Sequence, residues 1–316
     1  FFFLLSLFPS STSPHLSSSR SKMEKHSAET SLFQFNALAS ILSYSFCSGS
    51  LLLFNKVVLW YIPCGPFITA TQFLFCIVVI FTLHLLKVVQ IEEITPDVAK
   101  KYGMYVFIFV AGVYVNMQSL KMSNVDVVIV FRAMTPLIVA VCEYLFMGRA
   151  FPTMRSLGAL LCIVLGTTWY VYCDTDTSMV AYGWVTLYMV LIALEMLWGK
   201  KIVGDVKVNL TTSVFCTNLF AFFPMVLLGY LRDDYAEIDP DWFTPNALFL
   251  LFVSCAISAG IGYSGWWCRT VVTAAAFTLV GTVNKILTVV LNIAIWDKHA
   301  SFIGTLGLFA CLAGGS

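Results

Sequence analysis

Apolar runs of about 17–26 residues recur along the whole chain, each bounded by charged residues or turn signals. About twenty apolar residues in a helix span the hydrocarbon core of a bilayer, where each backbone amide must find its hydrogen-bond partner within the helix. Charged residues make up only 11% of the 316 residues and hydrophobic residues 59%, whereas soluble domains carry roughly 25% charged residues. The sequence therefore predicts an all-α polytopic membrane protein.

Ten such runs predict ten transmembrane helices, joined by short connections except for an acidic one over residues 231–245. The expected helices are 35–60, 66–87, 102–121, 125–147, 154–173, 180–201, 209–230, 246–268, 271–296 and 300–316. Residues 1–31 are expected to be a disordered or artefactual N-terminal extension, because the opening FFFLLSLFP is too short to span a bilayer and a Ser-rich stretch follows it. The ten-helix domain is then expected to occupy residues 32–316, with its last helix cut short.

The two halves of the chain resemble each other in hydropathy and in the positions of their turns. Residues 54–56, for example, overlay residues 198–200 at a shift of 144. Each half holds five expected helices, an odd number, so repeats over about 35–173 and 180–316 are expected to be inverted relative to each other. Inverted repeats around a binding site at the middle of the membrane are an architecture of secondary transporters.

The distribution of positive charge predicts the orientation of the chain in the membrane. With the N-terminus in the cytosol, twelve of the 18 Lys and Arg residues, Arg269 among them, fall in cytosolic segments and three fall on the opposite side. Cytosolic loops of membrane proteins carry the excess of positive charge. Both termini are therefore expected in the cytosol, and the sequon at Asn209 is expected to remain unmodified on that side.

A single lysine, Lys285, lies in the middle of the apolar run over residues 271–296. An ammonium group at that depth costs about 2.5–3.5 kcal/mol on insertion scales, and such charges face a watery cavity or a negative partner. Both ends of the run are roughly 16 Å away, beyond the reach of the lysine side chain. Gly281, Thr282 and Asn284 leave space and donors beside it. This segment predicts a site for an anion inside the membrane.

Other polar side chains within the spans are candidates for the same site. An amide near an aromatic ring can bond and stack on a nucleobase, and the seventh expected span offers Phe215, Thr217 and Asn218. Thr217 and Asn218 could equally bond a neighbouring helix, and Lys56 could reach the membrane interface instead of a cavity. The remaining candidates for the cavity wall are Tyr114, Asn116 and Tyr263, and the intramembrane charges without an assigned partner are Arg132, Glu143 and Glu195.

Signatures of enzymes, cofactors and metals are missing from the sequence. The aspartates of Asp174-Thr175-Asp176 have the spacing used by metal-dependent glycosyltransferases, but they lie in a short turn without a domain that could form a catalytic cleft. The ten cysteines have no metal or disulfide spacing, and a net charge of +1 gives no nucleic-acid footprint. We therefore expect no cofactor, no metal and no nucleic-acid partner.

The segment Gly281-Thr282-Val283-Asn284-Lys285, with its flanks, resembles the G-x-x-N-K motif of nucleotide-sugar transporters in the drug/metabolite transporter superfamily. The likeness covers residues 32–316 and points to the GDP-sugar branch, in particular to plant Golgi carriers of the GDP-L-fucose type. It implies that Gly281, Thr282, Asn284 and Lys285 contact the diphosphate and the sugar. A second family motif, F-Y-N-N, is associated with the guanine, and residues 215–218 keep only its first and last members.

The resemblance implies an antiporter in the Golgi membrane that exchanges cytosolic GDP-sugar, with GDP-L-fucose as the best guess and GDP-mannose as a relative, for lumenal GMP by alternating access. No residue selects the sugar, and the oligomeric state is open, a homodimer included. Three alternatives stay open: a sugar-phosphate/phosphate antiporter of the same superfamily, a membrane-embedded glycosyltransferase, and a structural or chaperone-like membrane protein. Competition by GMP or by inorganic phosphate separates the two antiporters, and product formation without transport identifies the transferase.

Overall fold

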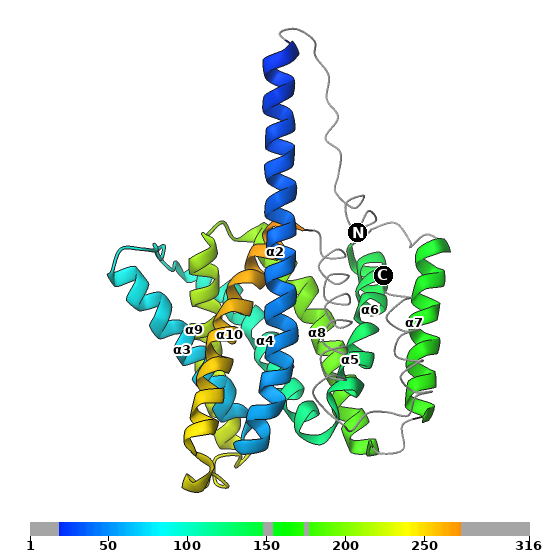
Figure 1. Cartoon of the computed structure of the whole chain (residues 1–316), viewed down its shortest axis with the longest axis vertical. Helices are drawn as coiled ribbons and strands as arrows, with labels where there is room; N and C mark the ends of the chain where they lie inside the picture. The colour runs from blue at the N-terminus through cyan, green and yellow to red at the C-terminus, as the bar shows by residue number, and fades with distance from the viewer. Residues whose placement is uncertain (1–18, 148–153, 174–176, 273–316) are drawn as a thin grey trace.

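The computed structural model describes residues 19–147, 154–173 and 177–272, and within these ranges every regular element is helical. The helices form a bundle (Figure 1). Their bounds are α2 Ser19–Tyr61, α3 Gly65–Leu85, α4 Pro96–Met122, α5 Val125–Ala133, α6 Thr135–Met147, α7 Met154–Cys173, α8 Met179–Asp205, α9 Leu210–Leu231 and α10 Pro245–Val271, with a 3-10 turn at Pro240–Trp242.

Seven segments of the described chain are long and apolar enough to cross a membrane. They lie in α2, α3, α4, α5 with α6, α8, α9 and α10, while α7 carries a shorter apolar stretch, Leu161–Tyr172. Helices are thus confirmed at the first eight expected positions. The ninth and tenth expected spans lie outside the described residues, apart from the first two residues of the ninth. The protein is an all-helical membrane protein.

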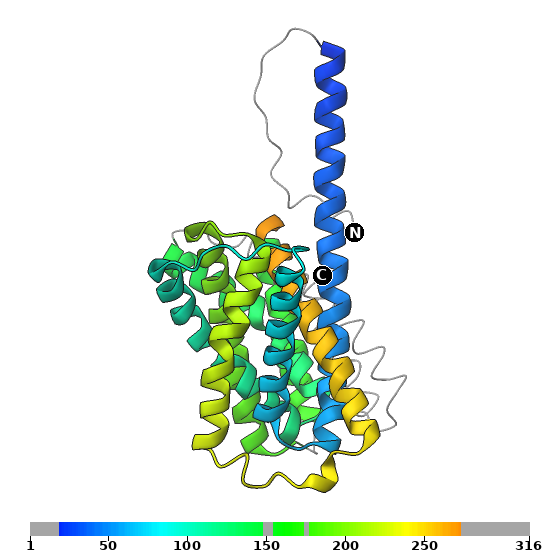
Figure 2. The same cartoon turned by 90° about the vertical axis from the view of Figure 1, so that its left-hand side faces the viewer.

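Helix α2 starts earlier than expected. It begins at Ser19 and extends beyond the ends of the other helices in Figure 2. Residues 19–31, which the sequence assigns to an N-terminal extension, are therefore helical in the structure, and residues 1–18 lie outside the described chain, so that extension stays a prediction. The physical reason is local, because residues 19–48 contain neither Gly nor Pro and include the good helix formers Lys, Met, Glu, Ala and Leu.

The fourth expected span is helical but is interrupted at Met134, between α5 and α6. Around this break the amide of Met134 bonds the carbonyl of Phe131 at 3.0 Å and the amide of Leu137 bonds the carbonyl of Met134 at 3.0 Å, so the helix is tighter there. Pro136 follows directly and has no amide hydrogen to donate. Pro224, by contrast, lies inside α9 without dividing it.

The most extensive helix contacts join α2 to α10, α4 to α8 and α3 to α9, which in each case pairs an element of the first half with one of the second. Helix α7 lies at the edge of the bundle in Figure 1 and packs chiefly on α5. Because each of these pairs joins a helix of the first half to one of the second, the interior of the bundle is lined by residues far apart in sequence.

The connections between helices also pack against helix starts. Asn209 caps α9 by accepting a bond from the amide of Thr212 at 2.7 Å, and its side-chain nitrogen donates to the carbonyl of Gln90 at 2.9 Å. In the connection after α9, Tyr235 packs on Gly229, where an added Cβ would lie 2.6 Å from the phenol ring. Burial raises the pKa of Tyr235 to about 12, so the phenol packs there uncharged.

Candidate anion-binding cavity

A cavity of about 200 Å³ lies inside the bundle, lined from α2, α3, α4, α5, α8, α9 and α10. Its lining contains three chemical groups. Charged and phenolic side chains are Tyr44, Tyr105, Arg132, Tyr188, Glu195 and Arg269. Hydroxyl and amide side chains are Ser48, Asn55, Thr69, Gln72, Asn116, Thr217, Asn218 and Ser258. Aromatic rings are added by Phe73, Phe109 and Trp266.

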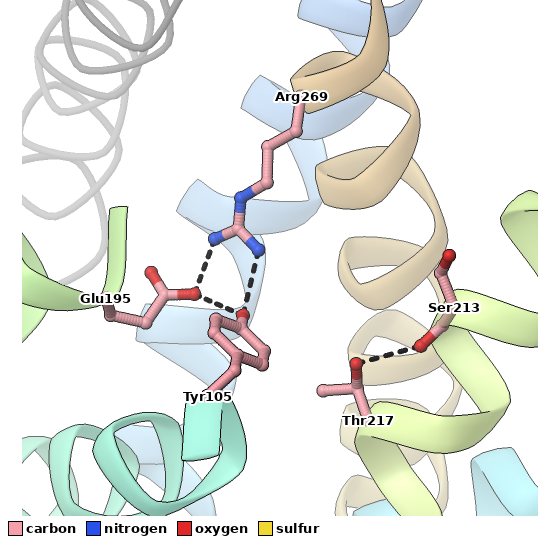
Figure 3. Close-up of polar contacts among 5 residues, drawn as sticks. All are labelled: Tyr105, Glu195, Ser213, Thr217 and Arg269. Atoms are coloured by element: carbon pink, nitrogen blue, oxygen red, sulfur yellow. Dashed lines mark hydrogen bonds and ion pairs between the residues drawn. The ribbon is translucent and has the colours of Figure 1, made fainter. Parts of the chain in front are cut away.

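An ion pair between Arg269 of α10 and Glu195 of α8 forms part of the cavity wall (Figure 3). Nη2 of the arginine lies 2.6 Å from Oε1 of the glutamate, and both side chains are 11% exposed. Nη1 donates to the phenol oxygen of Tyr105 at 2.9 Å, and that phenol donates in turn to the same Oε1. Three helices thus contribute one member each to a closed triangle of charge-assisted bonds.

Neighbouring residues leave a slot that fits the guanidinium of Arg269. Its Cζ lies 5.2 Å from the ring centre of Trp266 and 5.9 Å from that of Tyr105, distances typical of cation–π contacts. On α8, a Cβ at Gly199 would lie 3.1 Å from Nη1 of Arg269 and 3.2 Å from its Cζ. Glycine at position 199 therefore provides the room in which the arginine lies.

Lysine side chains hold the ends of two helices beside the cavity. Nζ of Lys200 donates to the carbonyls of Arg269 and Val272 at 2.7 and 2.6 Å, at the end of α10. Nζ of Lys56 donates to the carbonyl of Ser123 at 2.9 Å and also to that of Leu120, at the end of α4. The last carbonyls of a helix carry a partial negative charge and otherwise lack donors, so both contacts are favourable.

The expectation that Arg269 is a cytosolic loop charge is wrong. The residue lies in the last turn of α10, and its side chain is buried against Glu195. A helical side chain points back toward the N-terminus of its helix, so an arginine near the end of α10 can reach into the bundle rather than away from it. Glu195, whose partner the sequence left unassigned, thereby receives a counter-charge.

Arg132, at the end of α5, is the second cation of the cavity lining. The phenol of Tyr44 lies beside its guanidinium, but its buried Nε has no hydrogen-bond partner. Among the side chains that the structure describes, no carboxylate lies within ion-pair distance of Arg132. The described lining therefore holds two arginines and one glutamate, an excess of one positive charge. Inside a bundle of low dielectric, such an excess attracts anions.

An amide network lines another part of the cavity. Nε2 of Gln72 donates to Oδ1 of Asn55 at 2.8 Å and to Oγ of Ser254 at 3.2 Å, which joins α3 to α2 and α10. On α9, Thr217 donates to the carbonyl of Ser213 at 2.8 Å (Figure 3), and Nδ2 of Asn218 bonds the carbonyl of Val214 at 2.8 Å. Thr217 and Asn218 therefore bond their own helix rather than a neighbouring one.

Three of the residues predicted for the site line the cavity, namely Asn116, Thr217 and Asn218. Oδ1 of Asn116 is buried without a hydrogen-bond partner, so an acceptor is available beside the cavity. Phe215 is outside the lining and packs against the hydrophobic core. The four residues of the predicted phosphate and sugar motif, Gly281, Thr282, Asn284 and Lys285, lie outside the described part of the chain.

The other three candidates lie away from the cavity lining. Tyr114 is buried and donates to Oδ2 of Asp234 at 3.3 Å, in the connection after α9. Tyr263 is 45% exposed, because its neighbour Gly262 occupies the cavity face of α10 and consecutive helical residues point about 100° apart. Lys56 is not among the cavity-lining residues, and its ammonium group bonds carbonyls at the end of α4.

Several cavity residues were not predicted for the site. Arg132 and Glu195 carried a usable signal, because charges within apolar spans face cavities or partners. A second signal was the spacing of Ser258, Gly262, Trp266 and Arg269, which recur every three or four residues and so share one face of α10. The phenols of Tyr44, Tyr105 and Tyr188 carried no comparable signal.

No family model matches the chain. The GDP-fucose transporter 1 of Arabidopsis thaliana is 32% identical over 289 residues, which cover 89% of this chain and 85% of the relative. The GDP-mannose transporter GONST3 of the same plant is 32% identical over 278 residues, covering 86% and 75% of the two chains. A GDP-mannose transporter of Meyerozyma guilliermondii is 26% identical over 318 residues, covering 92% and 89%.

A crystal structure at 13% sequence identity shares the fold with a TM-score of 0.61, over 90% of this chain and 95% of the other. Membrane-spanning helices around an internal cavity fit a transport protein, and the similar proteins are named as transporters. The chain belongs to the nucleotide-sugar transporter family, among the members named for GDP-fucose and GDP-mannose.

Proposed function

We propose that this protein exchanges cytosolic GDP-sugar for lumenal GMP across the Golgi membrane, with both chain termini in the cytosol. GDP-L-fucose is the first candidate sugar, because GDP-fucose transporter 1 is similar over a larger share of both chains than GONST3. The observation that carries the proposal is the excess of positive charge in the described cavity lining, inside a chain of this family.

The described cavity offers groups that suit both ends of such a substrate. The guanidinium of Arg132 has an unused donor, and the planar donor array of arginine matches phosphate oxygens. Asn116 and Asn218 offer amides to a base, beside the aromatic ring of Phe109. In this proposal Gly281 to Lys285 complete the phosphate and sugar end of the site.

Matched contacts support an architecture of two inverted repeats. Lys56 and Lys200 are separated by the shift of 144 at which the sequence halves overlay, and each holds the end of a helix, α4 or α10. The connections match as well. The one after α3 bonds Asn209 at the start of α9, and the one after α9 bonds Cys64 at the start of α3, with Sγ 3.4 Å from the carbonyl of Asp234.

Exchange rather than one-way transport follows from the shared phosphate groups of the two substrates. An empty cavity with excess positive charge is unfavourable inside a membrane, and a bound phosphate neutralises it. The same cations bind GDP-sugar and GMP, so the loaded carrier changes its facing more readily than the empty one. The proposed exchange requires neither ATP nor a metal.

A counterflow panel tests the proposal. Proteoliposomes preloaded with GMP are expected to take up labelled GDP-fucose or GDP-mannose, but not UDP- or CMP-sugars, and Lys285→Ala is expected to abolish this uptake while still inserting and folding. Absence of GMP-driven uptake of any GDP-sugar overturns the proposal. Inhibition by inorganic phosphate or triose phosphate, but not by GMP, identifies a sugar-phosphate antiporter instead, and a glycosylated product without transport identifies an enzyme.

A further inference from the structure

Glu195 presents a problem for any site that binds anions. Its carboxylate lines the same cavity as Arg132 and Arg269, where it repels an incoming phosphate. A membrane-embedded ionisable residue is costly, so a glutamate at this place calls for a physical explanation. Glu195 bonds two partners, Arg269 and Tyr105, and its side chain forms part of the cavity wall.

The two arginines of the cavity differ in how they are compensated. Arg269 is bonded to Glu195 at 2.6 Å and to Tyr105 at 2.9 Å, whereas no carboxylate among the described residues lies within ion-pair distance of Arg132. A carboxylate and a phosphate present oxygen pairs of similar geometry to a guanidinium. Glu195 therefore occupies, toward Arg269, the place that a phosphate of the substrate takes when it enters.

We propose that Glu195 is an internal counter-anion that competes with the substrate phosphate for Arg269 and thereby sets the affinity and release rate of the carrier. This proposal rests on the function proposed above. In the empty carrier the carboxylate neutralises Arg269. In the loaded carrier phosphate shares or takes over the arginine, and the nearby carboxylate weakens the hold on the substrate. When substrate leaves, the ion pair re-forms.

In this cycle Tyr105 is a hydrogen-bond partner of both charged residues, which an apolar side chain could not be. Its hydroxyl donates to Glu195 and accepts from Arg269, so it touches both members of the pair. When Arg269 turns to a phosphate, the phenol still donates to the carboxylate, and the buried charge keeps one partner. Gly199 leaves room for the guanidinium in its ion-paired position, from which it turns to the phosphate.

If Glu195 competes with phosphate, removing its charge should raise the affinity for GMP and lower the rate of exchange. Glu195→Gln keeps the shape and an acceptor oxygen but removes the negative charge, so GMP is expected to bind about tenfold more tightly. The rate of exchange at saturating GMP is expected to fall, because no carboxylate is present to displace the phosphate from Arg269 when GMP leaves. Glu195→Asp, which restores the charge, is expected to return the affinity toward the wild-type value. Glu93→Gln, the same change at an exposed position after α3, serves as the matched control without effect.

The test uses purified wild-type and variant protein in detergent for binding and in liposomes for exchange, with melting temperatures recorded for each. Unchanged or weaker GMP binding in folded Glu195→Gln overturns the proposal, since a purely structural ion pair predicts that result. The gain is also expected to vanish in the variant that combines Glu195→Gln with Arg269→Gln, and a gain that persists there likewise overturns it.

Two further measurements keep the proposal testable on their own. Should Glu195→Gln not fold, Arg269→Lys retains the charge and loses the planar donor pair, so phosphate binding is expected to weaken by about fivefold or more. Unchanged binding in Arg269→Lys contradicts the proposal. Every affinity is measured with GMP and with inorganic phosphate. Competition between Glu195 and phosphate can therefore be judged even if the wild type shows no GDP-sugar counterflow. Absence of counterflow overturns only the proposed function.

Discussion

At the scale of single residues, the cavity shows how surroundings determine what a charged side chain does. Arg269 lies in a triangle of bonds with Glu195 and Tyr105, so it contributes to holding α4, α8 and α10 together. Arg132 has a buried Nε without a partner and no carboxylate among the described residues within ion-pair distance. Such a charge is costly to the fold and favours an incoming anion.

Arg132→Gln is therefore expected to lower GMP exchange by at least about tenfold, because a cation that meets the phosphate is lost. The melting temperature is expected to stay the same or rise, since a charge without a carboxylate partner among the described residues is removed from the bundle interior. Counterflow in liposomes and thermal melting in detergent measure the two effects. Arg132→Lys should keep part of the exchange, and wild-type exchange by Arg132→Gln would exclude this arginine from phosphate recognition.

Gly199→Ala is expected to destabilise the protein by about 1–3 kcal/mol, because the added Cβ would lie 3.1 Å from Nη1 of Arg269 and push it from its slot. Helix α8 offers a matched control in Gly183, where a Cβ meets nothing within 4 Å. Alanine there is expected to be neutral or to stabilise α8 by up to about 1 kcal/mol. Equal melting temperatures for the two variants would contradict the assigned role of Gly199.

At the scale of helices, two lysines bond the end of a helix other than their own. Lys56 of α2 holds the end of α4, and Lys200 of α8 holds the end of α10. Both helix ends lead directly into the next segment of the chain, so these contacts determine where α5 begins and where the chain leaves α10. The break at Met134 belongs to the same scale, because Pro136 denies the backbone an amide hydrogen.

Lys56→Met and Lys200→Met are each expected to lower the free energy of unfolding by about 1.5–3 kcal/mol, the range for hydrogen bonds to a charged group. Methionine keeps most of the apolar stem, so the loss reports the ammonium group. The control is Lys201→Met, an exposed neighbour whose ammonium lies 5.4 Å from the ring centre of Trp198, with an expected loss below about 1 kcal/mol. Melting temperatures that rank Lys201→Met with the other two variants would argue against helix capping.

At the scale of the whole molecule, the proposed orientation in the membrane rests on the distribution of positive charge. With Arg269 reassigned to the bundle interior, eleven Lys and Arg residues still lie in the segments expected on the cytosolic side, against three on the other. In the connection after α9, Arg232 is the one basic residue, and such a scarcity of positive charge is typical of the side opposite the cytosol. The proposed two-repeat architecture requires the connections after α3 and after α9 to lie on opposite sides of the membrane.

A short insertion carrying a glycosylation sequon tests this arrangement. Placed after Glu237, in the connection after α9, it is expected to be glycosylated in cells. The same insertion after Glu93, in the connection after α3, is expected to stay unmodified, as is Asn209, whose side-chain nitrogen bonds the carbonyl of Gln90. A gel shift with and without glycosidase reads the result. Modification after Glu93 alone would invert the topology.

Much of the fold could be predicted from the sequence, because a membrane helix satisfies its backbone within its own segment and needs only length and apolarity. This is why the first eight expected helices coincide with described ones. The candidate site was predicted less completely. Asn116, Thr217 and Asn218 were recognised as polar groups inside spans, but Tyr114 and Tyr263 have similar local sequence surroundings and lie away from the cavity.

By itself the sequence determined the class of protein and the positions of the eight expected helices that the structure describes, and it predicted an anionic substrate, since all of these follow from local composition and spacing. Only the tertiary structure decided which polar groups share one cavity and with what partners. In the sequence, Arg269 marks the end of an apolar span and so reads as a loop charge. In the structure, its side chain turns back along α10 to a glutamate 74 residues away on α8. No local pattern carries that information, because the packing of α2, α4, α5, α8 and α10 brings Tyr44, Tyr105, Arg132, Glu195 and Arg269 together.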